Sequence, residues 1–135
     1  MTPSDTPAPI IRVLCVDDLQ DMMEALSLLI DTEPSMTCVG RRSSADGLAA
    51  AIAAIHPPPH ILILDATMPG TDPLVALRDV SERCPETRTI IYTARSDEAF
   101  LARALDAGAW RCVLKSDEPT AILRAIRDVA GGSLD

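Results

Sequence analysis

Short runs of consecutive apolar residues alternate along the chain with longer segments in which apolar residues recur every three or four positions. Continuous apolar runs are typical of parallel strands buried on both faces, and the longer spacing is typical of helices that bury one face. Strand-like and helix-like segments follow one another in strict alternation. The predicted strands lie at about residues 11–16, 36–41, 61–64, 89–93 and 111–114.

Each predicted helix carries one apolar stripe. The first should stop before Pro34 and the fourth near Gly108, and Asp117 can cap a last helix over residues 118–130 that has Pro119 in its first turn. The stripes are Met22, Leu26, Leu29 and Ile30; Leu48, Ile52 and Ile55; Leu74, Leu77, Val80 and Cys84; Leu101, Ala104 and Leu105; and Ile122, Ile126 and Val129.

Five strand–helix units predict an α/β fold: a doubly wound parallel sheet with helices on both faces and right-handed crossovers. With 135 residues, 47% of them hydrophobic, the chain can form one sizeable core and has no room for a second domain. We expect this domain over residues 10–131. A flexible tail is expected over residues 1–9, and a C-terminal end or the start of a linker over residues 132–135.

Charge and composition exclude several classes of function. A net charge of −8 argues against contact with phosphate backbones, so this segment is not expected to bind DNA directly. The apolar runs fall short of the roughly 18 residues that a membrane span needs, and no signal peptide is recognisable, so a cytoplasmic location is expected. The four cysteines show no CxxC spacing, and three lie in strand-like runs, which favours small hydrophobic core residues.

Three carboxylates and the chain's only lysine stand where predicted strands end. Asp17 and Asp18 follow the first strand, Asp65 follows the third and Lys115 follows the fifth. Ligands of parallel sheets bind beyond the carboxyl ends of the strands, so these groups would converge if the strands are neighbours. Two carboxylates about 4 Å apart repel by roughly 4 kcal/mol at an effective dielectric near 20. Such a cluster requires a proton or a cation.

The order of these residues resembles that of a response-regulator receiver domain. The closing segment, residues 114–132, resembles the end of a receiver of the NarL/FixJ type. The resemblance covers about residues 11–130 and implies a flavodoxin-like sheet of five strands in the order 2-1-3-4-5, with five helices. The matching pieces are Val16-Asp17-Asp18, Leu64-Asp65-Ala66-Thr67-Met68-Pro69-Gly70, Tyr92-Thr93-Ala94, Ala107-Gly108-Ala109 and Val113-Leu114-Lys115.

The resemblance also implies roles. Asp65 would accept a phosphoryl group from a sensor histidine kinase, while Thr93 and Lys115 would contact the phosphoryl oxygens. No enzymatic activity is expected beyond phosphorylation of the domain itself and its reversal. The implied cofactor is Mg²⁺, held by Asp17, Asp18, Asp65 and the main-chain carbonyl of Thr67.

Two departures from the family pattern concern signalling. Receivers usually carry an aromatic switch residue three positions before the lysine, and Cys112 stands there, a thiol that cannot reproduce the movement of a ring. Tyr92 is a poor substitute because strand alternation points it away from the face of Thr93. Ser116 replaces the proline that usually follows the lysine, so a cis peptide is not expected there.

Trp110 leaves two interpretations open. It can pack over a strand end, or it can anchor an interface, because receivers commonly form homodimers through the fourth helix, fifth strand and fifth helix.

Four alternatives remain for the function as a whole. The chain can be a fragment of a transcriptional regulator whose helix-turn-helix follows it, which we favour, or a stand-alone receiver. It can also be a receiver-like interaction domain that works without phosphorylation. An aspartate-nucleophile phosphatase of the haloacid dehalogenase type fits less well, because it expects a second acid two residues after the nucleophile, where this chain has Thr67.

Overall fold

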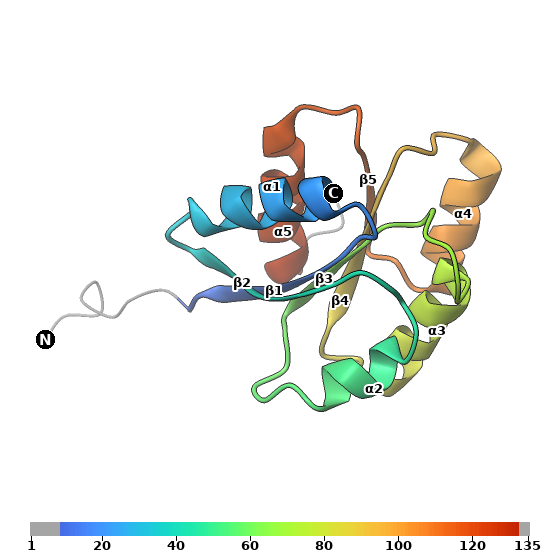
Figure 1. Ribbon diagram of the computed structural model, residues 1–135, viewed down its shortest axis with the longest axis horizontal. Coiled ribbons are helices and arrows are strands. Elements are labelled where there is room, and N and C mark those ends of the chain that lie inside the picture. Colours follow the sequence, from blue (N-terminus) through green and yellow to red (C-terminus); the bar gives the residue numbers. More distant parts are fainter. Residues whose placement is uncertain (1–8, 133–135) are drawn as a thin grey trace, which may run out of the picture.

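The computed structural model describes residues 9–132, which form a five-stranded parallel sheet in the order β2-β1-β3-β4-β5 (Figure 1). This confirms the fold class and the strand order implied by the resemblance. The elements are β1 (Ile11–Val16), α1 (Gln20–Asp31), β2 (Met36–Arg42), α2 (Leu48–Ala53), β3 (Ile61–Leu64), α3 (Pro73–Arg83), β4 (Arg88–Thr93), α4 (Glu98–Ala107), β5 (Arg111–Leu114) and α5 (Pro119–Ala130).

The predicted terminal segments fall almost wholly outside the described residues. Of the predicted tail over residues 1–9 only residue 9 is described, and of the predicted end over residues 132–135 only residue 132. Both remain predictions.

Two layers of helices enclose the sheet, with α1 and α5 on one face and α2, α3 and α4 on the other (Figure 1). Successive residues of a strand point to opposite faces, so β1 contributes to both cores. Val13 and Cys15 pack with α1 and α5, whereas Leu14 and Val16 pack with the other three helices. The central strand β3 is buried along its whole length, as its continuous apolar run predicts.

Two predictions about helices were wrong in detail. Asp117 does not cap α5, because Glu118 occupies the N-cap position and the Asp117 carboxylate instead accepts a hydrogen bond of 3.2 Å from the Leu114 backbone N–H. On α4, Leu105 is 52% exposed and Phe100 is buried in its place. Leu105 lies one position beyond the buried Ala104, and a rotation of about 100° per residue turns it toward solvent.

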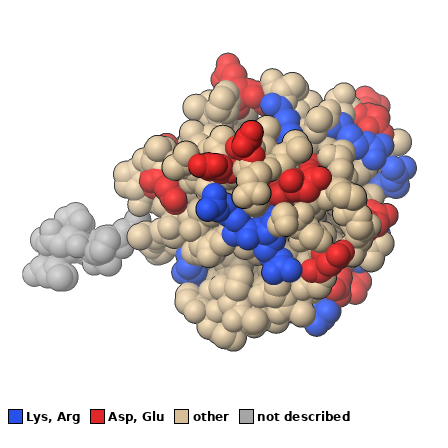
Figure 2. Space-filling model, in the orientation of Figure 1, with Lys and Arg blue, Asp and Glu red and all other residues tan. Residues whose placement is uncertain are grey.

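The surface carries charges of both signs. Figure 2 shows acidic and basic side chains interspersed over the visible face. Within residues 9–132, no helix has the length and apolar character needed to cross a bilayer.

Candidate functional site: an acidic cluster facing a lysine

Neighbouring strands bring the predicted acids together. β1 and β3 pair in parallel with Val16 opposite Leu64, so Asp17 and Asp65, the next residues of each strand, leave the sheet side by side. The Asp65 backbone N–H donates a hydrogen bond of 2.9 Å to the Val16 carbonyl, which extends the ladder by one step. Carboxylate oxygens of Asp17, Asp18 and Asp65 all lie within 4.8 Å of one another.

Lys115 lies between the two buried carboxylates of this cluster. Its Nζ is 2.8 Å from Asp17 Oδ2 and 3.7 Å from Asp65 Oδ1. The side chain is only 11% exposed, so water screens these ion pairs weakly. Its backbone N–H donates to the Thr93 carbonyl at 2.7 Å, which fixes the end of β5 beside β4. The sequence predicted that Lys115 would converge with these acids, but not that its shorter contact would be with Asp17.

Asp17 and Asp18 differ in their surroundings although they are adjacent. Asp17 is buried, and its Oδ1 accepts a hydrogen bond of 2.9 Å from the Leu19 backbone N–H while Oδ2 faces Lys115. Asp18 is exposed. The cluster therefore has a fixed inner side and an outer side open to solvent, from which an ion or a phosphoryl group can approach.

The protein environment holds the pKa of Asp65 above its ordinary value. Burial is the largest cause and the neighbouring negative charge of Asp17 is the second, while Lys115 and hydrogen bonds from Thr67 act in the opposite direction. The Thr67 hydroxyl and backbone N–H donate to Asp65 Oδ1 at 3.0 and 3.2 Å. These contacts were missed in the sequence analysis, although aspartates commonly accept hydrogen bonds from the residue two positions later.

The Thr93 hydroxyl lies at the end of β4, next to the lysine-bearing strand. Thr93 is fully buried and pairs with Leu114 of β5, and its Oγ1 accepts a hydrogen bond of 3.0 Å from the Arg95 backbone N–H. The role of Thr93 in contacting a phosphoryl group stays a prediction.

Cys112, at the usual switch position, and Tyr92 lie on opposite faces of the sheet. Cys112 packs against the core under α2, α3 and α4, whereas Tyr92 belongs to the core under α1 and α5. Ile91, which shares the face of Thr93 on β4, belongs to the same core as Cys112, so Tyr92 points away from the face of Thr93, as predicted. Among residues 9–132 the one cis peptide bond precedes Pro57, so the bond after Lys115 is trans, as expected.

Trp110 is partly buried and packs against the core under α1 and α5. The Arg88 guanidinium lies 4.1 Å from the centre of its ring, a cation–π distance. These contacts support the packing interpretation, and the interface interpretation stays a prediction.

The acidic cluster meets the chemical requirements of a small divalent cation. Three carboxylates face a single ammonium group, so the cluster retains net negative charge, and hard oxygen ligands suit Mg²⁺. Asp17, Asp18 and Asp65 would hold such an ion. The Thr67 carbonyl stays a predicted fourth ligand.

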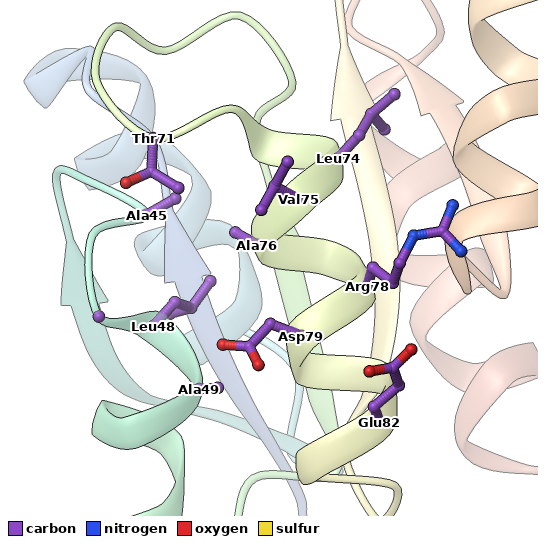
Figure 3. A pocket seen from close by; sticks show the side chains of 11 residues that line it. Ala45, Leu48, Ala49, Thr71, Leu74, Val75, Ala76, Arg78, Asp79 and Glu82 are labelled. Atoms are coloured by element: carbon purple, nitrogen blue, oxygen red, sulfur yellow. The ribbon is translucent and has the colours of Figure 1, made fainter.

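A well-formed hollow of the surface lies away from the cluster. It has a volume of about 430 Å³ and runs between α2 and α3, where Leu48 and Val75 contribute apolar surface and Asp79 and Glu82 contribute charge (Figure 3). None of the clustered acids lines it. We therefore assign the candidate site by its chemistry rather than by the size of its cavity.

A five-stranded 2-1-3-4-5 sheet with acids after β1 and β3 and a lysine after β5 defines a class of signalling domain. Residues 13–127 match the family model of the response regulator receiver domain, so the chain belongs to that family. Receivers of this family generally bind Mg²⁺ in an acidic pocket, and the solved structures that this chain resembles include response regulators named as NarL and as LuxR-family members.

The relatives are regulatory proteins, some of them named as transcriptional regulators. The oxygen regulatory protein NreC of Staphylococcus epidermidis is 31% identical over 122 residues, which are 90% of this chain and 55% of that protein. The DNA-binding transcriptional activator DevR/DosR of Mycobacterium tuberculosis is 28% identical over the same shares. The chain thus spans about half the length of these relatives.

Solved structures agree with this assignment. The signal receiver domain of the putative response regulator NarL from Mycobacterium tuberculosis superposes with a TM-score of 0.84 at 28% identity, covering 93% of this chain and 99% of that one. A two-component response regulator of the LuxR family from Aurantimonas sp. SI85-9A1 gives a TM-score of 0.85 at 27% identity, covering 92% and 87%.

Proposed function

We propose that this receiver accepts a phosphoryl group on Asp65 from a phosphohistidine of a sensor histidine kinase. The observation that carries the proposal is the convergence of Asp17, Asp18 and Asp65 within 4.8 Å, with Lys115 3.7 Å from Asp65. Buried carboxylates that face the fixed Lys115 ammonium suit a phosphoryl group. A carboxylate oxygen can attack its electrophilic phosphorus, and the ammonium attracts its negative oxygens.

The chain's own residues position the reacting oxygen. The hydrogen bonds and the ion pair described for the Asp65 carboxylate all involve Oδ1, which leaves Oδ2 to attack phosphorus. The bond from phosphorus to the histidine nitrogen breaks as the new bond from phosphorus to oxygen forms. Lys115 then faces the negative charge of the acyl phosphate, and the Thr93 hydroxyl donates to one of its oxygens. Bound Mg²⁺ would supply further neutralisation of charge between the carboxylates and the phosphoryl oxygens.

The output of the domain follows from its relatives by analogy. Because DevR/DosR is a DNA-binding transcriptional activator and this chain spans about half its length, we propose that the receiver controls a helix-turn-helix output domain in the cytoplasm. The homodimer surface that we expect consists of α4, β5 and α5, with Trp110 at its margin. The domain would catalyse only its own phosphorylation and dephosphorylation.

Incubation with acetyl phosphate tests the proposal. With Mg²⁺ present, the intact mass should rise by one phosphoryl group, and Asp65→Asn should abolish the rise. The matched control is Asp72→Asn, which changes a carboxylate that caps α3 outside the cluster and should leave the rise unchanged.

Two other outcomes would overturn the proposal. Absence of any adduct would favour an interaction domain that works without phosphorylation, an alternative that Cys112 at the usual aromatic position supports. Rapid turnover of external phosphoesters would favour a phosphatase.

A further inference from the structure

Two cysteines that are 23 positions apart in the sequence meet between β1 and β2. Their sulfur atoms are 4.0 Å apart, and both side chains face the core under α1 and α5. Cys15 is fully buried, whereas Cys38 is partly exposed and lines a surface hollow of about 240 Å³ together with Asp31 and Arg41. One thiol is therefore open to a small reagent, and the other lies directly behind it.

The surroundings of Cys38 favour a reactive thiolate. A hydrogen bond with the Cys15 thiol lowers the pKa of Cys38 to about 7, against the opposing effect of burial. Arg41 acts in the same direction as this hydrogen bond, and Asp31 acts against it. The Cys38 backbone N–H donates to Asp31 Oδ1 at 2.9 Å, which fixes the strand at this point. Thiolates rather than thiols react with peroxides, so Cys38 is the thiol expected to react first.

The other two cysteines lack these features. Cys84 and Cys112 belong to the core on the opposite face of the sheet, and burial raises the pKa of both thiols. The sheet separates them from Cys15 and Cys38. They serve as internal controls for any reaction of the pair.

We propose that Cys15 and Cys38 form a peroxide-sensitive dithiol that closes to a disulfide between β1 and β2. In the first step the Cys38 sulfur attacks one oxygen of hydrogen peroxide. The S–O bond forms, the O–O bond breaks, and the departing hydroxide takes a proton to become water. In the second step the Cys15 sulfur attacks the Cys38 sulfur of the sulfenic acid, so that the S–S bond forms and the S–O bond breaks. The hydroxide leaves with the Cys15 proton as a second water.

The local structure of the sheet can accommodate this closure. A disulfide requires a sulfur–sulfur distance of about 2.05 Å, so the two sulfur atoms, 4.0 Å apart, must approach by roughly 2 Å. β2 is an edge strand, and its pairing with β1 shifts register opposite Val13 and Leu14, where Val39 is passed over. A bulge locally disrupts the ladder and bends its strand, and in the sheet β2 is hydrogen-bonded to β1 alone.

The test uses the reduced protein treated with hydrogen peroxide at pH 7 under native conditions. We expect the intact mass to fall by two hydrogen atoms, about 2 Da. Peptide mapping should recover a link between Cys15 and Cys38, with Cys84 and Cys112 still alkylatable. Cys112→Ser should keep the mass loss. Cys15→Ala should instead leave a sulfenic acid at Cys38 that dimedone traps.

Alkylation rates give a second, independent measurement. Cys38 should react with iodoacetamide at pH 7 about tenfold faster than Cys112, because a larger share of it is thiolate. The alkylation rate of Cys38 should rise with increasing pH, with a midpoint near pH 7. Equal rates for the two cysteines, or a peroxide-treated protein without the Cys15–Cys38 link, would overturn the proposal. Peptide mapping of the unmutated protein decides the question even if Cys15→Ala fails to fold. None of these measurements depends on phosphorylation, so they stand apart from the proposal for Asp65.

Discussion

Among residues 9–132, Lys115 is the one positive charge held against these two buried carboxylates, 2.8 Å from Asp17 and 3.7 Å from Asp65. Removing it leaves both carboxylates without their shared partner in a site that water barely enters. We expect Lys115→Ala to lower the free energy of unfolding by about 3 kcal/mol, measured by urea denaturation without divalent ions.

Arg124→Ala supplies the control for this prediction, because its contact with Glu118 is long and exposed. This substitution should lower the free energy of unfolding by about 0.5 kcal/mol or less. Equal losses in the two variants would mean that Lys115 does not neutralise the cluster.

The raised pKa of Asp65 predicts a pH dependence with a definite sign. The folded state holds the Asp65 proton more tightly than the unfolded chain does. The free energy of unfolding therefore falls as the pH rises from the ordinary aspartate value through the raised one. Without Mg²⁺, Asp65→Asn should be more stable than the unmutated protein at pH 7, because it removes the buried negative charge. This gain should vanish toward pH 4.

Thermal unfolding at several pH values measures this difference. The exposed Asp106 on α4 gives the matched control, Asp106→Asn, which relieves no burial and should show no comparable gain. A variant Asp65→Asn that is less stable at pH 7 would contradict the electrostatic account of the site.

At the scale of residues, the sequence identified the acids and the lysine because each follows a recognisable strand. It could not identify contacts that depend on the path of a side chain. The Asp17–Lys115 ion pair and the Thr67 hydrogen bonds belong to this group. The meeting of Cys15 and Cys38 depends instead on which strands are neighbours and in which register, and no spacing in the sequence encodes that.

Among the elements, the junction of α4 and β5 depends most clearly on one residue. Gly108 ends α4 with a φ of +121°, and a Cβ there would lie 2.0 Å from Ser81 Oγ on α3. We expect Gly108→Ala to lower the free energy of unfolding by about 3 kcal/mol or more, as measured by chemical denaturation.

Gly47 is a control in which a substitution causes backbone strain without a steric clash. Its φ is +62°, and a Cβ there would meet nothing within 4 Å. Gly47→Ala should lower the free energy of unfolding by about 1 kcal/mol. Adding Ser81→Gly to Gly108→Ala should restore part of the loss, since it removes the contacting side chain. Failure of that double variant to recover any stability would show that the clash is not the cause.

Element type and order followed from periodicity, because strands buried on both faces and one-sided helices leave different apolar patterns. The errors concern single residues, which periodicity places only to within about one position. Asp117 lies one residue before the N-cap of α5, and Leu105 lies one residue beyond the buried Ala104 of α4.

For the molecule as a whole, the acidic cluster couples metal binding to stability. An ion that binds only the folded state adds about 2.7 kcal/mol to the free energy of unfolding when its concentration is about 100 times its Kd. We expect Mg²⁺ to raise the melting temperature of the unmutated protein, and Asp18→Asn to lose this response while melting nearly normally without Mg²⁺, since Asp18 is exposed. Asp21→Asn, an exposed carboxylate on α1, should keep the response. An unchanged Mg²⁺ effect in Asp18→Asn would remove Asp18 from the ligand set.

The arrangement of the whole sheet could be predicted only in part. Alternating strands and helices predict a parallel doubly wound sheet, but the pattern does not specify which strands are neighbours. The order 2-1-3-4-5 came from the resemblance to receivers, and the structure confirms it. The convergence of Asp17, Asp65 and Lys115 depends on that order, because it makes β1, β3 and β4 consecutive and places β5 beside β4.

The central claim is that Asp65, within this cluster, receives the phosphoryl group. Reduction of the phosphorylated protein with borohydride converts an acyl phosphate into an alcohol, and tandem mass spectrometry then locates the altered residue. We predict homoserine at position 65 and unaltered aspartate at positions 17 and 18. Homoserine at either of those positions, or at none of the three in a protein that has gained a phosphoryl group, would contradict the account.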